Sequence, residues 1–107
     1  MSPEVKEKID SLLKSNTILV FMKGTKQMPQ RGFSNNVAQI LTSLGAPYET
    51  VDVLADYDIR QGIKEYSNWP TIPQVYIGGE FIGGSDIMIE LYQSGKLQEM
   101  VEVALAS

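Results

Sequence analysis

A β-hairpin is predicted by the segment Gln74-Val75-Tyr76-Ile77-Gly78-Gly79-Glu80-Phe81-Ile82-Gly83, in which a glycine pair separates two short apolar runs. Adjacent glycines permit the positive φ angles that a tight hairpin turn requires. The strands of a hairpin are antiparallel, whereas the residues before this segment predict strands joined through a helix, as in a parallel pair. The sequence therefore predicts a mixed sheet.

The residues before the hairpin predict strands that alternate with helices. Thr17–Met22 is apolar without alternation, which is typical of a central strand covered on both faces. Tyr48–Val53 predicts a second strand, after the loop Lys23–Arg31 and a helix. Five helices are indicated by apolar residues at helical spacing. Their markers are Val5, Ile9, Leu12 and Leu13, then Val37, Ile40, Leu41 and Leu44, then Ile59, Ile63 and Tyr66, then the segment from Ser85 to Leu91, and finally Leu97, Met100, Val101, Ala104 and Leu105.

The starts of these helices carry residues that suit an N-cap. Ser2 is expected to cap the first helix, and Asp56 or Ala55 the third. Ser85 with Asp86 is expected to cap the fourth. No repeat, linker or low-complexity segment interrupts this order, so we expect a single domain over residues 1–107.

The composition argues against several classes of protein. Nine basic and thirteen acidic residues give a formal net charge of −4, which disfavours nucleic acid, because phosphate backbones are bound by clustered Lys and Arg. No stretch approaches the roughly twenty apolar residues that span a bilayer. We therefore expect no membrane contact, and a bacterial cytoplasm or an organelle stroma or matrix. The chain has no cysteine and no histidine, so a soft metal would need ligands from outside it.

The loop before the second helix resembles the active-site loop of a known family. It reads Met28-Pro29-Gln30-Arg31-Gly32-Phe33-Ser34, and the monothiol glutaredoxins carry the signature Cys-Gly-Phe-Ser there. Arg31 stands at the position of the family's cysteine. The other segments that match the family, in the same order, are Phe21-Met22-Lys23-Gly24-Thr25, Arg60, Trp69-Pro70-Thr71-Ile72-Pro73 and Gly83-Gly84-Ser85-Asp86. The resemblance implies an α/β, thioredoxin-like fold, with a four-stranded mixed sheet flanked by about five helices.

The resemblance also implies that the chain binds glutathione, a tripeptide with a carboxylate at each end, one ammonium group and a central thiol. Lys23 and Arg60 are expected to face its glycine-end carboxylate. A cis bond between Ile72 and Pro73 is expected to turn the Ile72 backbone toward the glutathione cysteine. The expected glutathione-binding residues are Lys23, Gly32, Phe33, Arg60, Thr71, Ile72, Pro73, Gly84, Ser85 and Asp86.

Several of these residues also have a purely structural interpretation. Arg60 lies four residues after Asp56 and could form an ion pair on the helix surface. Ser85 or Asp86 could simply cap a helix, and the segment from Thr71 to Pro73 could be a rigid turn. Trp69-Pro70 suits either the buried base of the loop or a wall beside the peptide.

Arg31 removes the chemistry that the family performs at this position. A cysteine there would be the nucleophile or a ligand of a [2Fe–2S] cluster, but a guanidinium that never deprotonates has no lone pair to offer. We therefore expect an inactive site without a metal ligand in this chain. A natural redox-inert homologue and a substitution in a cysteine-containing parent both remain open. Arg31 could fill the place of the thiol and block the cleft, or it could pair with a glutathione carboxylate.

Two hypotheses of function follow. The first is a monothiol glutaredoxin-type protein whose parent carries [2Fe–2S] clusters to recipient proteins or exchanges thiols and disulfides with glutathione, disabled here by Arg31. The second is a redox-inert thioredoxin-fold module that binds protein partners through the same cleft or through Gly32, Phe33 and Ser34. Because dimerisation in the family depends on the shared cluster, we expect a monomer. An oxidoreductase with two cysteines is excluded by the composition.

Overall fold

The computed structural model describes residues 1–107. Four strands form one sheet in the order β2-β1-β3-β4. They are β1 (Ile18–Met22), β2 (Glu49–Asp52), β3 (Gln74–Ile77) and β4 (Glu80–Gly83). β1 pairs in parallel with β2 and antiparallel with β3, and β3 pairs antiparallel with β4. The prediction of a mixed sheet is therefore confirmed. Every residue of β1 is buried, as expected of a central strand.

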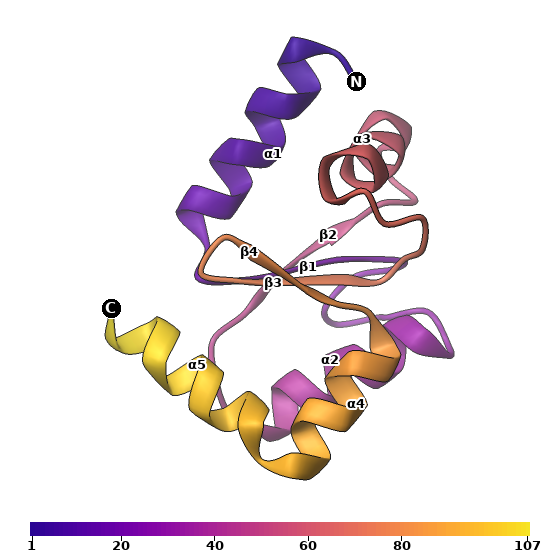
Figure 1. Ribbon diagram of the computed structural model, residues 1–107. Coiled ribbons are helices and arrows are strands. Elements are labelled where there is room, and N and C mark those ends of the chain that lie inside the picture. The colour runs from indigo at the N-terminus through magenta and orange to yellow at the C-terminus, as the bar shows by residue number, and fades with distance from the viewer.

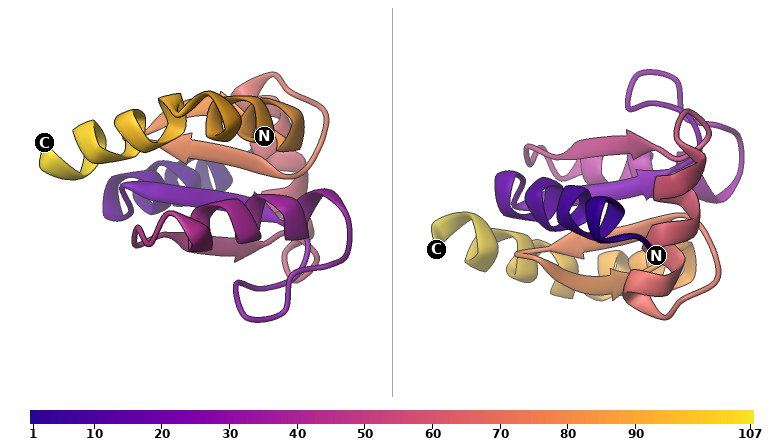
Figure 2. Two further views of the ribbon diagram at one scale, coloured as in Figure 1. Left: turned by 90° about the horizontal axis from the view of Figure 1, so that it is seen from below. Right: turned by 90° about the horizontal axis from the view of Figure 1, so that it is seen from above.

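Helices cover both faces of the sheet (Figures 1 and 2). α1 (Pro3–Ser15) and α3 (Tyr57–Ser67) lie on one face, while α2 (Phe33–Ser43), α4 (Ser85–Ser94) and α5 (Lys96–Ala106) lie on the other. Side chains alternate along a strand, so β1 feeds two separate cores. Leu19 and Phe21 pack toward α1 and α3, and Val20 and Met22 pack toward α2, α4 and α5. This is the predicted thioredoxin-like fold.

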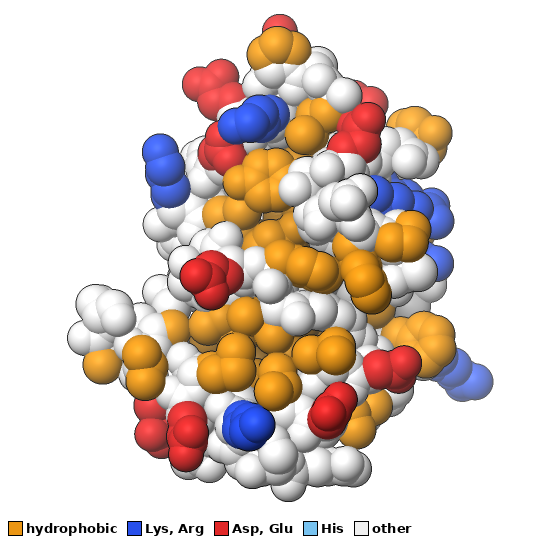
Figure 3. Space-filling view, viewed as in Figure 1, with side chains coloured by type: hydrophobic (Ala, Val, Ile, Leu, Met, Phe, Trp, Pro, Cys, Tyr) orange, Lys and Arg blue, Asp and Glu red, His pale blue; other side chains and the backbone are white.

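Seen toward the β4 edge of the sheet, apolar side chains show across the middle of the molecule and charged side chains lie mainly around its periphery (Figure 3). No helix has both the length and the apolar character needed to cross a membrane.

The hairpin turn has the backbone that its glycines predict. Gly78 and Gly79 adopt φ angles of 61° and 81°. In the ladder that follows, Val75 lies opposite Gly83 but Tyr76 lies opposite Phe81, so β4 contains one extra residue. Such a β-bulge bends a strand locally. It lies where the chain leaves β4 and enters α4.

Two of the three predicted helix N-caps are confirmed. The Val5 N–H donates to the Ser2 side chain at 3.2 Å, and the Ile59 N–H donates to the Asp56 carboxylate at 3.1 Å. The predicted cap of α4 is wrong. Gly84 is its N-cap, with no side-chain capping bond, and Ser85 is already the first helical residue. The reason is that the extended backbone after the bulge continues to Gly84, whose carbonyl accepts the Met88 N–H at 3.1 Å.

Other boundaries differ by a few residues. β1 begins at Ile18 rather than Thr17, and β2 spans Glu49–Asp52 rather than Tyr48–Val53. α4 runs to Ser94, three residues beyond the predicted Leu91.

Antiparallel pairing determines which loops meet. Because β1 runs opposite to β3, and β3 opposite to β4, the end of β1, the start of β3 and the end of β4 share one edge of the sheet. Lys23, Pro73 and Gly84 directly flank these strand ends. Segments separated by fifty residues of sequence are thereby brought to the same place.

Candidate functional site

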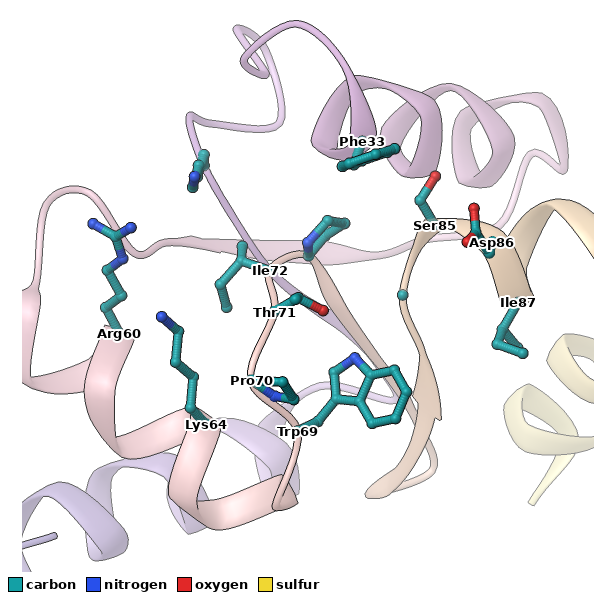
Figure 4. A pocket seen from close by; sticks show the side chains of 13 residues that line it. Phe33, Arg60, Lys64, Trp69, Pro70, Thr71, Ile72, Ser85, Asp86 and Ile87 are labelled. Carbon is teal, nitrogen blue, oxygen red and sulfur yellow. The ribbon is translucent and has the colours of Figure 1, made fainter.

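A pocket of about 520 Å³ lies at this edge of the sheet (Figure 4). Its walls come from the end of β1, the start of α2, one side of α3, the loop before β3 and the start of α4. The lining residues are Lys23, Phe33, Arg60, Lys64, Trp69, Pro70, Thr71, Ile72, Pro73, Gly84, Ser85, Asp86 and Ile87. Nine of the ten residues predicted to bind glutathione are among them, and Gly32 is not.

The pocket is positively charged in a chain that is negatively charged overall. Lys23, Arg60 and Lys64 supply three cations, and Asp86 is the one carboxylate in the wall. Arg60 and Lys64 lie at one side of the pocket and Asp86 at the other (Figure 4). The pocket therefore favours an anionic ligand that carries a positive group at one end.

Arg60 does not pair with Asp56, so the ion pair considered from the sequence is absent. The Asp56 carboxylate pairs with Lys8 at 2.9 Å and caps α3 through Ile59. The hydrogen bond from Lys8, and then that from the Ile59 N–H, lowers the pKa of Asp56. Arg60 Nε is buried and has no hydrogen-bond partner. The guanidinium is held in the wall of the pocket with bonding capacity to spare.

Ser85 presents a second polar atom without a partner. The residue is only 6% exposed, and its Oγ forms no hydrogen bond within the chain. It lies at the N-terminus of α4, across the pocket from Arg60 (Figure 4). A buried polar group is normally hydrogen-bonded, because leaving it unpaired is costly. Unpaired groups on both sides of one pocket point to a ligand that bonds to both.

The loop between α3 and β3 forms the floor of the pocket. The expected cis bond between Ile72 and Pro73 is present. The indole of Trp69 packs against Phe81, with ring centroids 5.9 Å apart, and also lines the pocket. Trp69 is 43% exposed, so it is not the buried base of the loop, and it lies in the wall of the pocket.

Arg31 lies outside the pocket. It is exposed, does not line the wall and forms no ion pair. Gly32 follows as the N-cap of α2, with φ at 90° and no side-chain capping bond. Phe33, the first helical residue, is 65% exposed and lines the pocket. In this structure, therefore, the Arg31 side chain does not block the cleft.

The serine of the Gly-Phe-Ser motif has a structural role that the sequence did not reveal. Ser34 is 4% exposed, and its Oγ accepts the backbone N–H of Lys23 at 3.1 Å. This bond joins the start of α2 to the end of β1. Ser34 thus holds in place the backbone of the lysine that enters the pocket.

The loop that precedes Arg31 is folded tightly against Gly24. The Gln30 N–H donates to the Lys23 carbonyl at 3.0 Å, and the Thr25 N–H donates to the Met28 carbonyl at 3.1 Å. A Cβ atom added at Gly24, whose φ is +89°, would lie 2.5 Å from the Met28 carbonyl oxygen. Only glycine fits this close approach.

The chain does not provide the ligands of an iron–sulfur cluster. It contains no cysteine and no histidine, and no group of three or more His, Cys, Asp or Glu side chains is arranged to hold a metal ion. Thiolates are the usual ligands of such clusters. The residues around Arg31 therefore do not fit a [2Fe–2S] group.

The groups with clearly shifted pKa values lie away from the pocket. Tyr66 donates a hydrogen bond to Asp10 at 2.7 Å, which raises the pKa of Tyr66 and lowers that of Asp10. Burial raises the pKa of Tyr76 to about 12. These groups are part of the core and surface, not of the pocket wall.

Two lining residues, Lys64 and Ile87, were missed by sequence reasoning. Lys64 lies one helical turn after Arg60, so the two share a face of α3. That spacing was the available signal. Ile87 belongs to α4 and carried no comparable signal.

Comparison with known proteins gives consistent matches. A family model described as Glutaredoxin matches residues 18–82. A protein of Synechocystis sp. described as "Uncharacterized monothiol glutaredoxin ycf64-like" is 75% identical over 107 residues, which is 100% of both chains. The chloroplastic monothiol glutaredoxin-S7 of Oryza sativa subsp. japonica is 54% identical over 107 residues, which is 100% of this chain and 64% of the rice protein.

Solved structures show the same similarity. The solution structure of reduced poplar apo GrxS14 superposes with a TM-score of 0.88 at 55% identity, covering 99% of this chain and 97% of the poplar chain. The crystal structure of a buckwheat glutaredoxin–glutathione complex superposes with a TM-score of 0.79 at 28% identity, covering 97% and 96%.

Proposed function

Because the chain belongs to the monothiol glutaredoxin family, we propose that its pocket binds glutathione and that Arg31 prevents the cysteine chemistry of the family. The observation that carries this proposal is the pair of buried polar atoms without partners, Arg60 Nε and Ser85 Oγ, on two sides of one pocket. Glutathione has an anionic group at each end and can bond to both. A glutathione complex of a related glutaredoxin supports the choice of ligand.

The cationic side of the pocket suits the glycine end of glutathione. Arg60 can offer a forked pair of N–H donors to a carboxylate, and Lys23 and Lys64 add charge beside it. The glycine carboxylate would be attracted by three cations, whereas the γ-glutamyl end would meet only backbone N–H groups, Ser85 and Asp86. We therefore expect the glycine end to contribute most of the binding free energy.

The opposite side suits the γ-glutamyl end. The first N–H groups of α4 have no partners within the helix, and their dipoles favour an anion. Ser85 Oγ lies at the same helix end and is free to donate. Asp86 is then placed to pair with the neighbouring ammonium group of the ligand. This division of charge matches the one carboxylate and three cations of the wall.

Arg31 leaves this chain without a nucleophile. A guanidinium cannot attack a disulfide or ligate iron, so bound glutathione would not be turned over. For a cysteine-containing parent we infer the carriage of [2Fe–2S] clusters to recipient proteins, or thiol–disulfide exchange with glutathione, in a bacterial cytoplasm or an organelle stroma. For this chain we infer a monomeric, single-domain glutathione-binding protein.

A redox-inert protein-binding module remains the alternative, and one observation favours it. Phe33 is 65% exposed and Met28 is 80% exposed, on the loop and helix start that surround Arg31. Exposed aromatic and methionine side chains are common at protein interfaces. Partner binding without any affinity for glutathione would support this alternative.

Glutathione binding can be followed through Trp69, which is the one tryptophan of the chain and lines the pocket. The fluorescence should change and saturate with glutathione. Glutathione monoethyl ester, whose glycine carboxylate is neutral, should bind at least about tenfold more weakly, because a hydrogen bond to a charged group contributes about 1.5–3 kcal/mol. Absence of binding, or equal binding of the ester, would contradict the proposal.

The role of Arg31 is tested by anaerobic reconstitution with iron, sulfide and glutathione, on this chain and on Arg31→Cys in parallel. Visible absorption should appear only in the Arg31→Cys variant. Colourless samples of both would favour the protein-binding module. Light scattering should find the unsubstituted chain monomeric, and a stable dimer would contradict that expectation.

A further inference from the structure

Gln74 is a polar residue at the start of β3 that is fully buried, with 0% exposure. Its side chain nevertheless forms three hydrogen bonds. Nε2 donates to the Trp69 carbonyl at 3.0 Å and to the Thr71 carbonyl at 3.3 Å, and Oε1 accepts from the Tyr76 hydroxyl at 3.2 Å. Gln74 does not itself line the pocket, but two of its partners lie in the loop that does.

These partners allow only one orientation of the amide. A carbonyl oxygen can only accept a hydrogen bond, so Nε2 must face Trp69 and Thr71. Oε1 must then face Tyr76, whose hydroxyl has to act as the donor. The three hydrogen bonds of Gln74 are therefore all made within the protein, and two of them hold the loop on its side away from the pocket.

The bond to Thr71 also determines where the next N–H points. A trans peptide unit is planar, and its C=O and N–H point in opposite directions. The Thr71–Ile72 peptide bond is trans, since Ile72–Pro73 is the only cis bond in the chain. With the Thr71 carbonyl turned inward to Gln74, the Ile72 N–H points the opposite way, on the side of the pocket that Thr71 and Ile72 line.

The Ile72 N–H has no partner within the protein. Ile72 lies outside every helix and strand, and its N–H donates neither to a backbone carbonyl nor to a side chain. A backbone donor beside a pocket can bond to the backbone of an extended peptide, as in strand addition. The structure thus provides a free peptide donor in Ile72, which lies between the two charged sides of the pocket (Figure 4).

We propose that Gln74 is a positioning residue for ligand binding. Its buried amide holds the Thr71–Ile72 peptide unit so that the Ile72 N–H stays available to the backbone of a peptide ligand. The identity of that ligand, glutathione, rests on the proposed function above. Gln74 acts through the loop and does not touch the ligand.

Two variants test this role. Gln74→Glu keeps the side-chain length and the acceptor for Tyr76 but removes at least one of the two donors to the loop, because a carboxyl group has one O–H when protonated and none when ionised. Gln74→Met removes all three bonds. Each should weaken glutathione binding by about tenfold, the effect of one or two lost backbone hydrogen bonds. Val101→Ala is the control, because it makes a cavity in the core on the far side of the sheet from α3 and leaves the loop intact.

The expected result is a tenfold loss in both Gln74 variants and a change of less than twofold in Val101→Ala. Native affinity in either Gln74 variant would overturn the proposal. So would an equal loss in Val101→Ala at similar stability, because the loss would then reflect destabilisation alone.

A second measurement reads the loop without any ligand. In amide NMR spectra, the Ile72 resonance should shift between the native chain and Gln74→Glu, and should stay in place in Val101→Ala. An unshifted Ile72 resonance would overturn the positioning role even if the variant bound weakly. If the native chain shows no response to glutathione but Ile72 shifts as expected, the proposed function fails and the positioning role of Gln74 stands.

Discussion

Replacing Gly24 by alanine should destabilise the protein far more than replacing Gly45 by alanine. Both glycines have positive φ angles, +89° and +70°, so alanine is conformationally strained at either position. The two sites differ in the space around them. A Cβ at Gly24 would lie 2.5 Å from the Met28 carbonyl oxygen and 2.7 Å from the Gln30 nitrogen, whereas a Cβ at Gly45 would meet nothing within 4 Å.

The difference in unfolding free energy between the two variants can be estimated from the backbone hydrogen bonds that break in the loop beside Gly24. The backbone strain, about 1–3 kcal/mol for a non-glycine residue in such a region, is common to both variants. To relieve the clash at Gly24, the loop has to give up its bonds from Thr25 to Met28 and from Gln30 to Lys23. At about 0.5–1.5 kcal/mol net for each hydrogen bond, the Gly24 variant should be less stable than the Gly45 variant by about 1–3 kcal/mol.

Urea unfolding followed by circular dichroism at neutral pH measures this difference, with the native chain as reference. Since about 1 kcal/mol corresponds to roughly 4–8 °C in a domain of about this size, thermal melts should separate the two variants by about 4–24 °C. Equal midpoints for the two variants would refute the reasoning, because they would show that the loop relaxes at no cost. The Gly24 variant should also bind glutathione more weakly, since the loop adjoins Lys23.

Three further predictions concern charged and buried groups. Arg60→Gln should weaken glutathione binding by about 10- to 100-fold, as expected for a charge-assisted bond of about 1.5–3 kcal/mol. Lys96 lies on the exposed start of α5 and provides the control. Lys96→Gln should change the affinity for glutathione less than twofold in the same titration. Asp56→Ala should lower the free energy of unfolding by about 1 kcal/mol at pH 7, measured in urea, because an N-cap is lost. The pKa of Asp56 is lowered chiefly by Lys8. The stability that Asp56 contributes to the folded state is therefore present above its ordinary pKa of about 3.9 and is lost as the pH falls through the folded value. An Asp56→Ala chain that is as acid-sensitive as the native chain would contradict this. The pKa of Tyr76 is raised to about 12, so the stability that Tyr76 contributes is complete below its ordinary pKa of about 10 and is lost between the two values. Tyr76→Phe should therefore flatten the decline of the unfolding free energy over that range of alkaline pH. An unchanged decline would rule the explanation out.

Most of the fold was predictable because its signals are local. The buried run Ile18–Met22 indicated a central strand, and the glycine pair at 78–79 indicated a hairpin turn. Ser2 and Asp56 were identified as caps because a cap bonds to an N–H only three residues away. The start of α4 was misplaced, because the bulge that shifts it depends on pairing between two strands.

The candidate site was predictable mainly through its resemblance to a family. The sequence by itself determined which charged and backbone groups were available, and the absence of any cysteine determined that no thiolate was among them. It left open whether Arg60 would pair with Asp56 and what Ser34 and Gln74 would do. Those outcomes depend on Lys8, Lys23 and the loop before β3, which are distant along the chain.

The tertiary structure alone decided that these groups would face one pocket. Antiparallel pairing brings the ends of β1 and β4 and the start of β3 to one edge, and α3 lies across it. Burial then leaves Arg60 Nε and Ser85 Oγ without partners, and turns the Gln74 amide inward so that the Ile72 N–H points out. Hydrogen bonds between distant segments form only once the sheet is assembled, which is why local patterns carry no record of them.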